Sequence, residues 1–146
     1  MSTPEPLRLA IAGCGAIAQL AHLPVLSKMR GVTLVALCDN DGARARSLAD
    51  RFEVPDVFTD LEELLEADAL DGLIVATPNH LHEPHVLSAL RAKVHVLCER
   101  PLAFSTRGVE RVLAAAQKSG ARVLVGNNHR FRTDVQALAR FVNSGE

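Results

Sequence analysis

The chain has 146 residues, of which 48% are hydrophobic and 23% charged, and its 16 basic and 17 acidic side chains nearly cancel. This length fits a single domain with a buried core, and the balanced charge argues against nucleic acid or an anionic membrane as the main partner. No apolar run approaches the roughly 20 residues that span a bilayer, and the three cysteines are scattered, which is typical of reduced thiols in a cytoplasmic protein.

Short apolar runs alternate with amphipathic stretches along the chain. The apolar runs predict six strands, at residues 7–12, 33–38, 56–58, 73–76, 94–97 and 122–125. The amphipathic stretches predict helices at residues 16–29 (with Pro24 as a candidate kink), 43–52, 61–66 (with Asp60 as N-cap), 81–91, 106–119 and 133–143. Continuous Val, Ile and Leu runs are typical of parallel strands that are buried on both faces. We therefore expect a doubly wound parallel α/β sheet, a Rossmann fold, with helices on both faces.

Several catalytic signatures are absent from the sequence. There is no GxxxxGK[ST] phosphate loop, no GxSxG elbow, no HExxH and no paired CxxC. The chain also has no tyrosine, so a mechanism that needs a tyrosine as general acid has no candidate here. These absences exclude P-loop nucleotidases, GxSxG hydrolases and the common zinc enzymes.

A glycine-rich segment separates the first predicted strand from the first predicted helix. It reads GCGAIA from Gly13 to Ala18, which fits the GxGxxA fingerprint of dinucleotide-binding proteins. Gly13 would make the tight turn, and Gly15 would let the backbone approach a pyrophosphate. The free N–H groups at the helix start, including those of Ala16 and Ile17, would hold the phosphates. A plain structural turn is the alternative interpretation.

An acidic residue ends the second predicted strand. Asp39 follows Gly15 by 24 residues, close to the separation of about 20 at which such an acid binds the ribose hydroxyls. Its carboxylate would repel a 2′-phosphate, and Asn40 stands where an arginine would favour NADP. Both observations favour NAD, while the nearby Arg44 keeps NADP open. The alternative is that Asp39 only begins a turn.

Five ordered segments point to a known family: AGCGAIA, LCDND, ATPNHLH, VLCERPLA and VGNNHRF. Together they resemble the N-terminal domain of the Gfo/Idh/MocA oxidoreductases, which include glucose–fructose oxidoreductase and inositol 2-dehydrogenase. The resemblance extends from about Leu7 to Glu146. It implies an NAD(P)-dependent enzyme that transfers hydride between the nicotinamide and a sugar, a polyol or a related secondary alcohol.

The resemblance also implies which residues line the cofactor crevice after the fourth predicted strand. In the family the loop at Thr77, Pro78 and Asn79 contacts the dinucleotide, together with a histidine at the position of His82. The alternative is that His82 only makes a local hydrogen bond at the start of the helix. The histidines of this segment have no Cys or acidic partner at ligand spacing, so we expect no metal site.

Three more candidates follow the fifth and sixth predicted strands. Glu99 and Arg100 stand where the family has Glu-Lys, and Glu99 would contact the cofactor and orient its neighbours. Arg100 replaces the lysine beside the nicotinamide, and it would act electrostatically on the reacting oxygen because a guanidinium does not exchange protons at neutral pH. Arg130 would hold the cofactor or a polar substrate, and Phe131 is expected in the core. Cys14, inside the glycine loop, is expected to fill space.

The length sets a further expectation about domains. Family members are more than twice as long, and their second domain carries the substrate pocket, a catalytic histidine and the usual oligomer interface. We expect residues 1–146 to form the dinucleotide-binding domain without that substrate domain, and to bind cofactor with little or no turnover. An apolar patch would then be exposed where the second domain docks, which could also support a homo-oligomer.

Two functions from other classes stay open beside this one. A stand-alone NAD(H)-binding sensor is favoured by Arg100 and by the missing domain. A methyltransferase also uses a glycine-rich loop and an acid after its second strand, but the TPN and ERP segments have no role in it.

Overall fold

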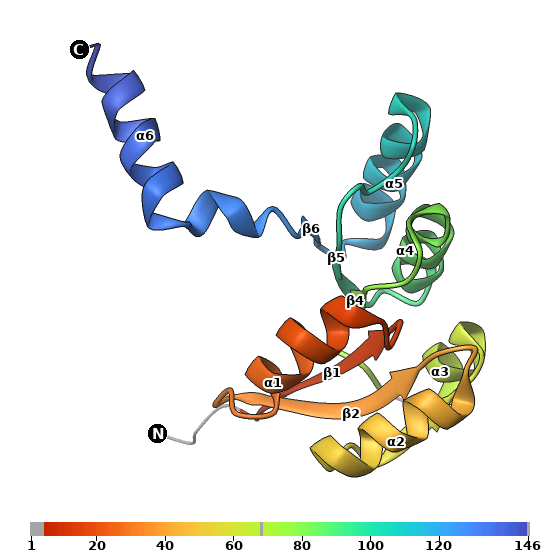
Figure 1. Ribbon diagram of the computed structural model, residues 1–146. Helices are drawn as coiled ribbons and strands as arrows, with labels where there is room; N and C mark the ends of the chain where they lie inside the picture. Colours follow the sequence, from red (N-terminus) through yellow and green to blue (C-terminus); the bar gives the residue numbers. More distant parts are fainter. Residues whose placement is uncertain (1–4, 68, 146) are drawn as a thin grey trace.

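One parallel sheet organises residues 5–67 and 69–145, the part of the chain that the computed structural model describes (Figure 1). Its strands are β1 (Leu7–Ala12), β2 (Val32–Cys38), β3 (Asp56–Phe58), β4 (Gly72–Val75), β5 (His95–Cys98) and β6 (Val123–Val125). They lie in the order β3-β2-β1-β4-β5-β6, and every neighbouring pair is parallel. The strand order reverses between β1 and β4, so the sheet is doubly wound, which confirms the predicted fold class.

Helices cover the sheet from both sides. The helical segments of the described residues are η1 (Ala18–His22, a π-helix), α1 (Leu23–Leu26), α2 (Gly42–Phe52), α3 (Leu61–Ala67), η2 (Asn79–Leu81), α4 (His82–Arg91), α5 (Thr106–Ser119), η3 (Asn128–Phe131) and α6 (Thr133–Ser144), of which α6 does not pack on the sheet. Side chains of α1 and α2 pack on one face with Ile11 and Leu37, and those of α3, α4 and α5 pack on the other with Val75 and Val96. None of the described helices has the length and apolar character needed to cross a bilayer.

The first helix is shorter and less regular than predicted. It was expected to reach Met29, but its last helical residue is Leu26, and its middle is a π segment that ends where the Leu23 N–H donates to the Ala18 carbonyl. Pro24 supplies the physical reason, because its ring lacks an N–H and collides with the carbonyl four residues back in a regular α-helix. The wider π turn moves that carbonyl away.

Side-chain caps begin three of the helices. The Asp60 carboxylate accepts from the backbone N–H groups of Glu62 and Glu63, which confirms its predicted role as N-cap of α3. Asp41 caps α2 and Ser105 caps α5 in the same way. Local sequence signals therefore set the starts of these helices.

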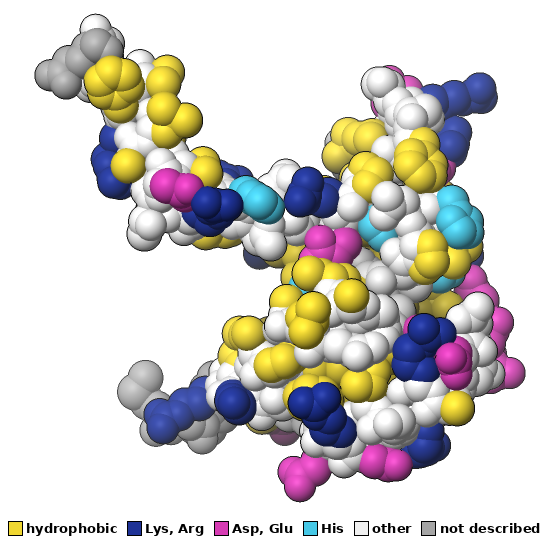
Figure 2. All heavy atoms as spheres, viewed as in Figure 1, with side chains coloured by type: hydrophobic (Ala, Val, Ile, Leu, Met, Phe, Trp, Pro, Cys, Tyr) yellow, Lys and Arg dark blue, Asp and Glu magenta, His cyan; other side chains and the backbone are white. Residues whose placement is uncertain are grey.

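The last helix projects away from the sheet (Figure 1). Hydrophobic side chains gather on it (Figure 2), and Leu138, for example, is 61% exposed. At the edge of the sheet, Leu124 and Val125 of β6 are also exposed. The prediction that Phe131 lies in the core is wrong, because it is 73% exposed on η3, where the chain turns into α6 and leaves the body. Large apolar side chains are therefore exposed on α6 and, separately, on β6.

Candidate functional site

The carboxyl ends of all six strands meet at one edge, and every predicted site residue lies in a loop or helix start at that edge. Backbone hydrogen bonds hold these loops together: Gly13 N–H donates to the Cys38 carbonyl at 2.8 Å, and Ala76 N–H to the Ala12 carbonyl at 2.7 Å. Glu99 N–H donates to the Val75 carbonyl at 2.9 Å. Residues that are distant in sequence are thus brought together by the parallel topology.

The two glycines of the loop after β1 have different surroundings. Gly13 has φ +96°, and a Cβ at this residue would lie 2.5 Å from the Ala76 carbonyl carbon, so only glycine fits the turn. A Cβ at Gly15 would meet no atom within 4 Å. Ala16 and Ile17, next along the chain, are the first helical residues and are exposed, and helix-start N–H groups have no partner within their helix. The loop therefore presents open backbone donors at the edge of the sheet.

Asp39 joins this loop to the end of β2. Its Oδ2 accepts from the Cys14 N–H at 2.7 Å and its Oδ1 from the Asp41 N–H at 2.9 Å, while Arg44 Nη2 lies 3.3 Å from Oδ1. The side chain is only 9% exposed. An ionised carboxylate offers about four acceptor positions, so these three contacts leave room for a further donor such as a ribose hydroxyl.

An acidic cavity of about 370 Å³ opens beside Asp39. Asn40, Thr77 and Pro78 line it as the sequence predicts for crevice residues, and three carboxylates line it as well: Asp39, Asp60 and Glu62. Within the described part of the chain, the lining holds no lysine or arginine. A ligand in this cavity would meet carboxylate oxygens that can accept hydrogen bonds from its hydroxyl groups, and a negative electrostatic potential.

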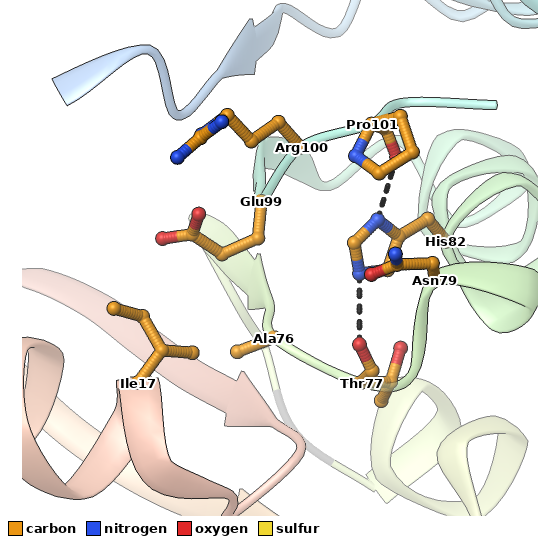
Figure 3. A pocket seen from close by; sticks show the side chains of 8 residues that line it. All are labelled: Ile17, Ala76, Thr77, Asn79, His82, Glu99, Arg100 and Pro101. Carbon is orange, nitrogen blue, oxygen red and sulfur yellow. Dashed lines mark hydrogen bonds between the residues drawn. The ribbon is translucent and has the colours of Figure 1, made fainter. Parts of the chain in front are cut away.

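A second cavity, of about 560 Å³, adjoins the first through Thr77 and is named here the Arg100 cavity (Figure 3). Its walls come from the first helix and from the loops after β4 and β5: Ile17, Ala76, Thr77, Asn79, His82, Glu99, Arg100 and Pro101. Figure 3 shows Ile17 facing Glu99 and Arg100 across it. The structure thus brings the predicted glycine-loop, TPN and ERP residues around two connected hollows.

His82 is a buried part of the wall of this cavity. It is 1% exposed, and its Nδ1 lies 2.7 Å from the Pro101 carbonyl and its Nε2 2.8 Å from the Thr77 carbonyl (Figure 3). Both polar atoms of the ring are therefore engaged by the backbone. His82 thus lines the cavity, but neither nitrogen is free to bind a ligand directly.

Glu99 is also paired within the protein. Its Oε1 lies 2.9 Å from Nε2 of His22, a contact between the loop after β5 and the first helix. The adjacent Arg100 is exposed and makes no ion pair among the described residues. Glu99 and His82 are both engaged by other groups of the protein. The Arg100 guanidinium is the unpaired charge of this cavity among the described residues, and it stays charged at neutral pH. It could therefore position a ligand and polarise it.

A family model described as "Oxidoreductase family, NAD-binding Rossmann fold", GFO_IDH_MocA, matches residues 7–127. The match covers every loop of the two cavities. The chain belongs to the Gfo/Idh/MocA family. This confirms the resemblance drawn from the five ordered segments, and it makes the chain an NAD(P)-binding Rossmann domain of an oxidoreductase family.

Individual relatives agree with this assignment. The chain is 34% identical over 143 residues to D-glucoside 3-dehydrogenase of Escherichia coli, with 98% of this chain and 41% of that protein covered. It is 31% identical to inositol 2-dehydrogenase of Corynebacterium glutamicum, with 97% and 42% covered. The chain thus spans about two fifths of the length of these relatives.

Solved structures show the same fold. Scyllo-inositol dehydrogenase from Lactobacillus casei, with bound NAD(H) and scyllo-inositol, superposes with a TM-score of 0.89 at 20% identity, covering 97% of this chain and 42% of that one. A variant 3-ketoreductase from Actinomadura kijaniata, in complex with TDP-benzene and NADP, has a TM-score of 0.89 at 29% identity, with 97% and 45% covered. The first of these structures contains NAD(H) and the second NADP.

Arg130 lies apart from the two connected cavities. It lines a separate hollow of about 320 Å³ with Arg100, Asn127, His129 and Val135, and its guanidinium lies 5.7 Å from the centre of the Phe131 ring. Since the Arg100 side chain is shared, this hollow neighbours the Arg100 cavity. The structure therefore places Arg130 at the rim of the site.

The three thiols are buried and free. Burial, and after it the Asp39 carboxylate, raises the pKa of the Cys14 thiol to about 12. Burial also raises the pKa values of Cys38 and Cys98 to about 12, with further contributions from Asp60 and Glu99 respectively. Thiols in this state are poor nucleophiles, which agrees with the prediction that Cys14 fills space.

Two parts of the site were missed by the sequence reasoning. Asp60 was predicted only as a helix cap and Glu62 was not among the predicted site residues, yet both line the acidic cavity. The strand order of a doubly wound sheet could have revealed this, because the end of β3 lies beside the end of β2. The pair between His22 and Glu99 had no sequence signal, since the two residues are 77 apart in the chain.

Proposed function

We propose that this chain is the NAD-binding half of an oxidoreductase that transfers hydride between the nicotinamide and a sugar, a polyol or a related secondary alcohol. On their own, residues 1–146 would bind the cofactor with little or no turnover, because they span only about two fifths of the length of the curated relatives. The bound nicotinamide would supply the hydride chemistry, and this chain would bind and orient it. The exposed apolar side chains of α6 and β6 support this proposal, since a further domain would cover them.

The open glycine loop beside a buried carboxylate is the observation that carries the proposal. A ligand can approach the backbone at Gly15 without steric hindrance, and the N–H groups of Ala16 and Ile17 would face a pyrophosphate there. The acidic cavity would hold the adenosine, with Asp39 and Asn40 toward the ribose. The Arg100 cavity would hold the nicotinamide, lined by Asn79, Glu99 and Arg100 at its far wall.

The charge of the acidic cavity favours NAD over NADP. A 2′-phosphate would enter a wall of three carboxylates, and like charges at close range disfavour binding. Two arginines pair with carboxylates of this wall: the Arg44 guanidinium lies 3.3 Å from Asp39 and the Arg91 guanidinium 3.2 Å from Glu62. Both guanidinium groups are thus already engaged, and neither arginine lines the cavity. NAD has two free hydroxyl groups on its adenosine ribose, and the carboxylates of the same wall would accept hydrogen bonds from them.

Calorimetric titration with NAD and NADP tests the proposal. The unmodified chain should bind NAD more tightly than NADP, and Asp39→Asn should weaken NAD binding on the order of tenfold and narrow the difference between the two. Asp50→Asn, on the exposed side of α2, is the matched control and should change neither affinity. Tighter binding of NADP would refute the cofactor preference, and binding of neither nucleotide would refute the site. Mixing the chain with NAD and inositol should give little or no NADH absorbance.

A further inference from the structure

The contact between His22 and Glu99 joins the first helix to the wall of the Arg100 cavity. Glu99 Oε1 lies 2.9 Å from His22 Nε2, and the side chains of His22 and Glu99 are only 16% and 20% exposed. A carboxylate oxygen accepts hydrogen bonds, so the ring donates from Nε2. A neutral imidazole with its proton on this atom already does so, and the contact therefore needs no charge on the ring.

The π turn of the first helix brings His22 to this position. His22 follows Ile17 by five residues, and residues five apart point about 140° away from each other in a regular α-helix. The hydrogen bonds of a π segment join residues five apart, so such a pair comes to the same side of the helix. His22 and Ile17 both line one hollow of about 500 Å³, and Glu99 lines it as well. Since Ile17 and Glu99 also line the Arg100 cavity, His22 supports the wall of that cavity from behind.

The contact with His22 leaves two polar groups of this wall available. Glu99 Oε2 has no hydrogen-bond partner among the described residues, and a Cβ at Gly126 would lie 3.2 Å from it, so the carboxylate is confined between the ring and the Gly126 backbone. The Arg100 guanidinium makes no ion pair within the described part of the chain. Figure 3 shows the Glu99 and Arg100 side chains projecting to the same side of the wall. Because their opposite charges attract, the bond to His22 competes with a direct pair between them.

We propose that His22 is a positioning residue, whose bond to one oxygen of Glu99 keeps the carboxylate from pairing with Arg100. Glu99 Oε2 and the Arg100 guanidinium then both stay available to a ligand in the Arg100 cavity. Oε2 accepts hydrogen bonds from amide or hydroxyl groups of the ligand, and Arg100 donates to its oxygens. That this ligand is the nicotinamide half of NAD rests on the proposed function, whereas the orientation of Glu99 does not depend on a cofactor.

Calorimetric titration of two variants with NAD and with ADP separates positioning from a general structural role. His22→Leu removes the donor, whereas His22→Gln keeps one near the position of Nε2. We expect His22→Leu to weaken NAD binding on the order of tenfold, the ratio for losing one charge-assisted hydrogen bond, and His22→Gln to restore most of it. ADP lacks the nicotinamide and its ribose, so it should bind both variants as it binds the unmodified chain. Leu20→Gln is the matched control on the same helix, because Leu20 is 81% exposed and lies outside both cavities.

Two NMR measurements test the orientation of Glu99 without a cofactor. A long-range ¹H–¹⁵N spectrum of the unmodified chain should show a proton on His22 Nε2, and the carboxyl ¹³C signal of Glu99 should shift in His22→Leu and return in His22→Gln. A ring protonated on Nδ1 alone, or a Glu99 signal that is the same in all three chains, would overturn the proposal.

The binding data can overturn it as well, either by unchanged NAD binding in His22→Leu or by equal weakening of NAD and ADP. If the unmodified chain binds no NAD, the proposed function fails. The ring and carboxyl signals then still decide whether His22 orients Glu99.

Discussion

Replacing Gly13 by alanine should destabilise the fold through a single methyl group. At φ +96° a residue with a side chain is strained by about 1–3 kcal/mol. The new Cβ would lie 2.5 Å from the Ala76 carbonyl carbon and oxygen and 2.6 Å from the Thr77 nitrogen, and forcing an atom into packed surroundings costs about 1–3 kcal/mol more. The total, about 4 kcal/mol, is a large share of the 5–15 kcal/mol that is typical of a domain.

Thermal unfolding followed by far-UV circular dichroism measures this loss, since the chain has no Trp or Tyr for fluorescence. A loss of about 4 kcal/mol predicts a fall in Tm on the order of 10 °C for a chain of this size. Gly15→Ala is the matched control, because its methyl would enter open space. It should leave stability within about 0.5 kcal/mol but weaken NAD binding, since the methyl lies where the pyrophosphate would approach. Equal melting temperatures for Gly13→Ala and the unmodified chain would refute the steric argument.

Two further predictions concern the titrating groups. The folded chain should resist alkylation by iodoacetamide at pH 8, and react fully once unfolded, because pKa values of about 12 keep the thiols of Cys14, Cys38 and Cys98 protonated; rapid labelling of the folded chain would contradict this. Burial lowers the pKa of His85 below its ordinary 6.5, so its neutral form contributes stability that is present above about pH 6.5 and is lost as the pH falls below it. His85→Asn should flatten the decline of Tm in this range, and an unchanged pH profile would contradict the assignment.

The sequence determined the architecture because its signals are local. Continuous Val, Ile and Leu runs are typical of parallel strands that are buried on both faces, and the turn at Gly13 needs a residue without a Cβ. Asp60 begins a helix through bonds to residues two and three positions away. Each of these features depends on neighbours in the chain, so the fold class and most helix starts could be predicted. The end of the first helix could not, because a π turn before Pro24 is one of several ways to accommodate a proline ring.

Tertiary structure alone decided how the site residues are used. Sequence motifs placed Asp39, His82 and Glu99 at strand ends, but their partners lie 25, 19 and 77 residues away, at Cys14, Pro101 and His22. Contacts of this kind arise from the strand order, which brings distant loops to one edge of the sheet. Phe131 was misplaced for the same reason, since its burial depended on whether α6 packs on the body. Hydrophobicity is a property of the residue, whereas burial is a property of the fold around it.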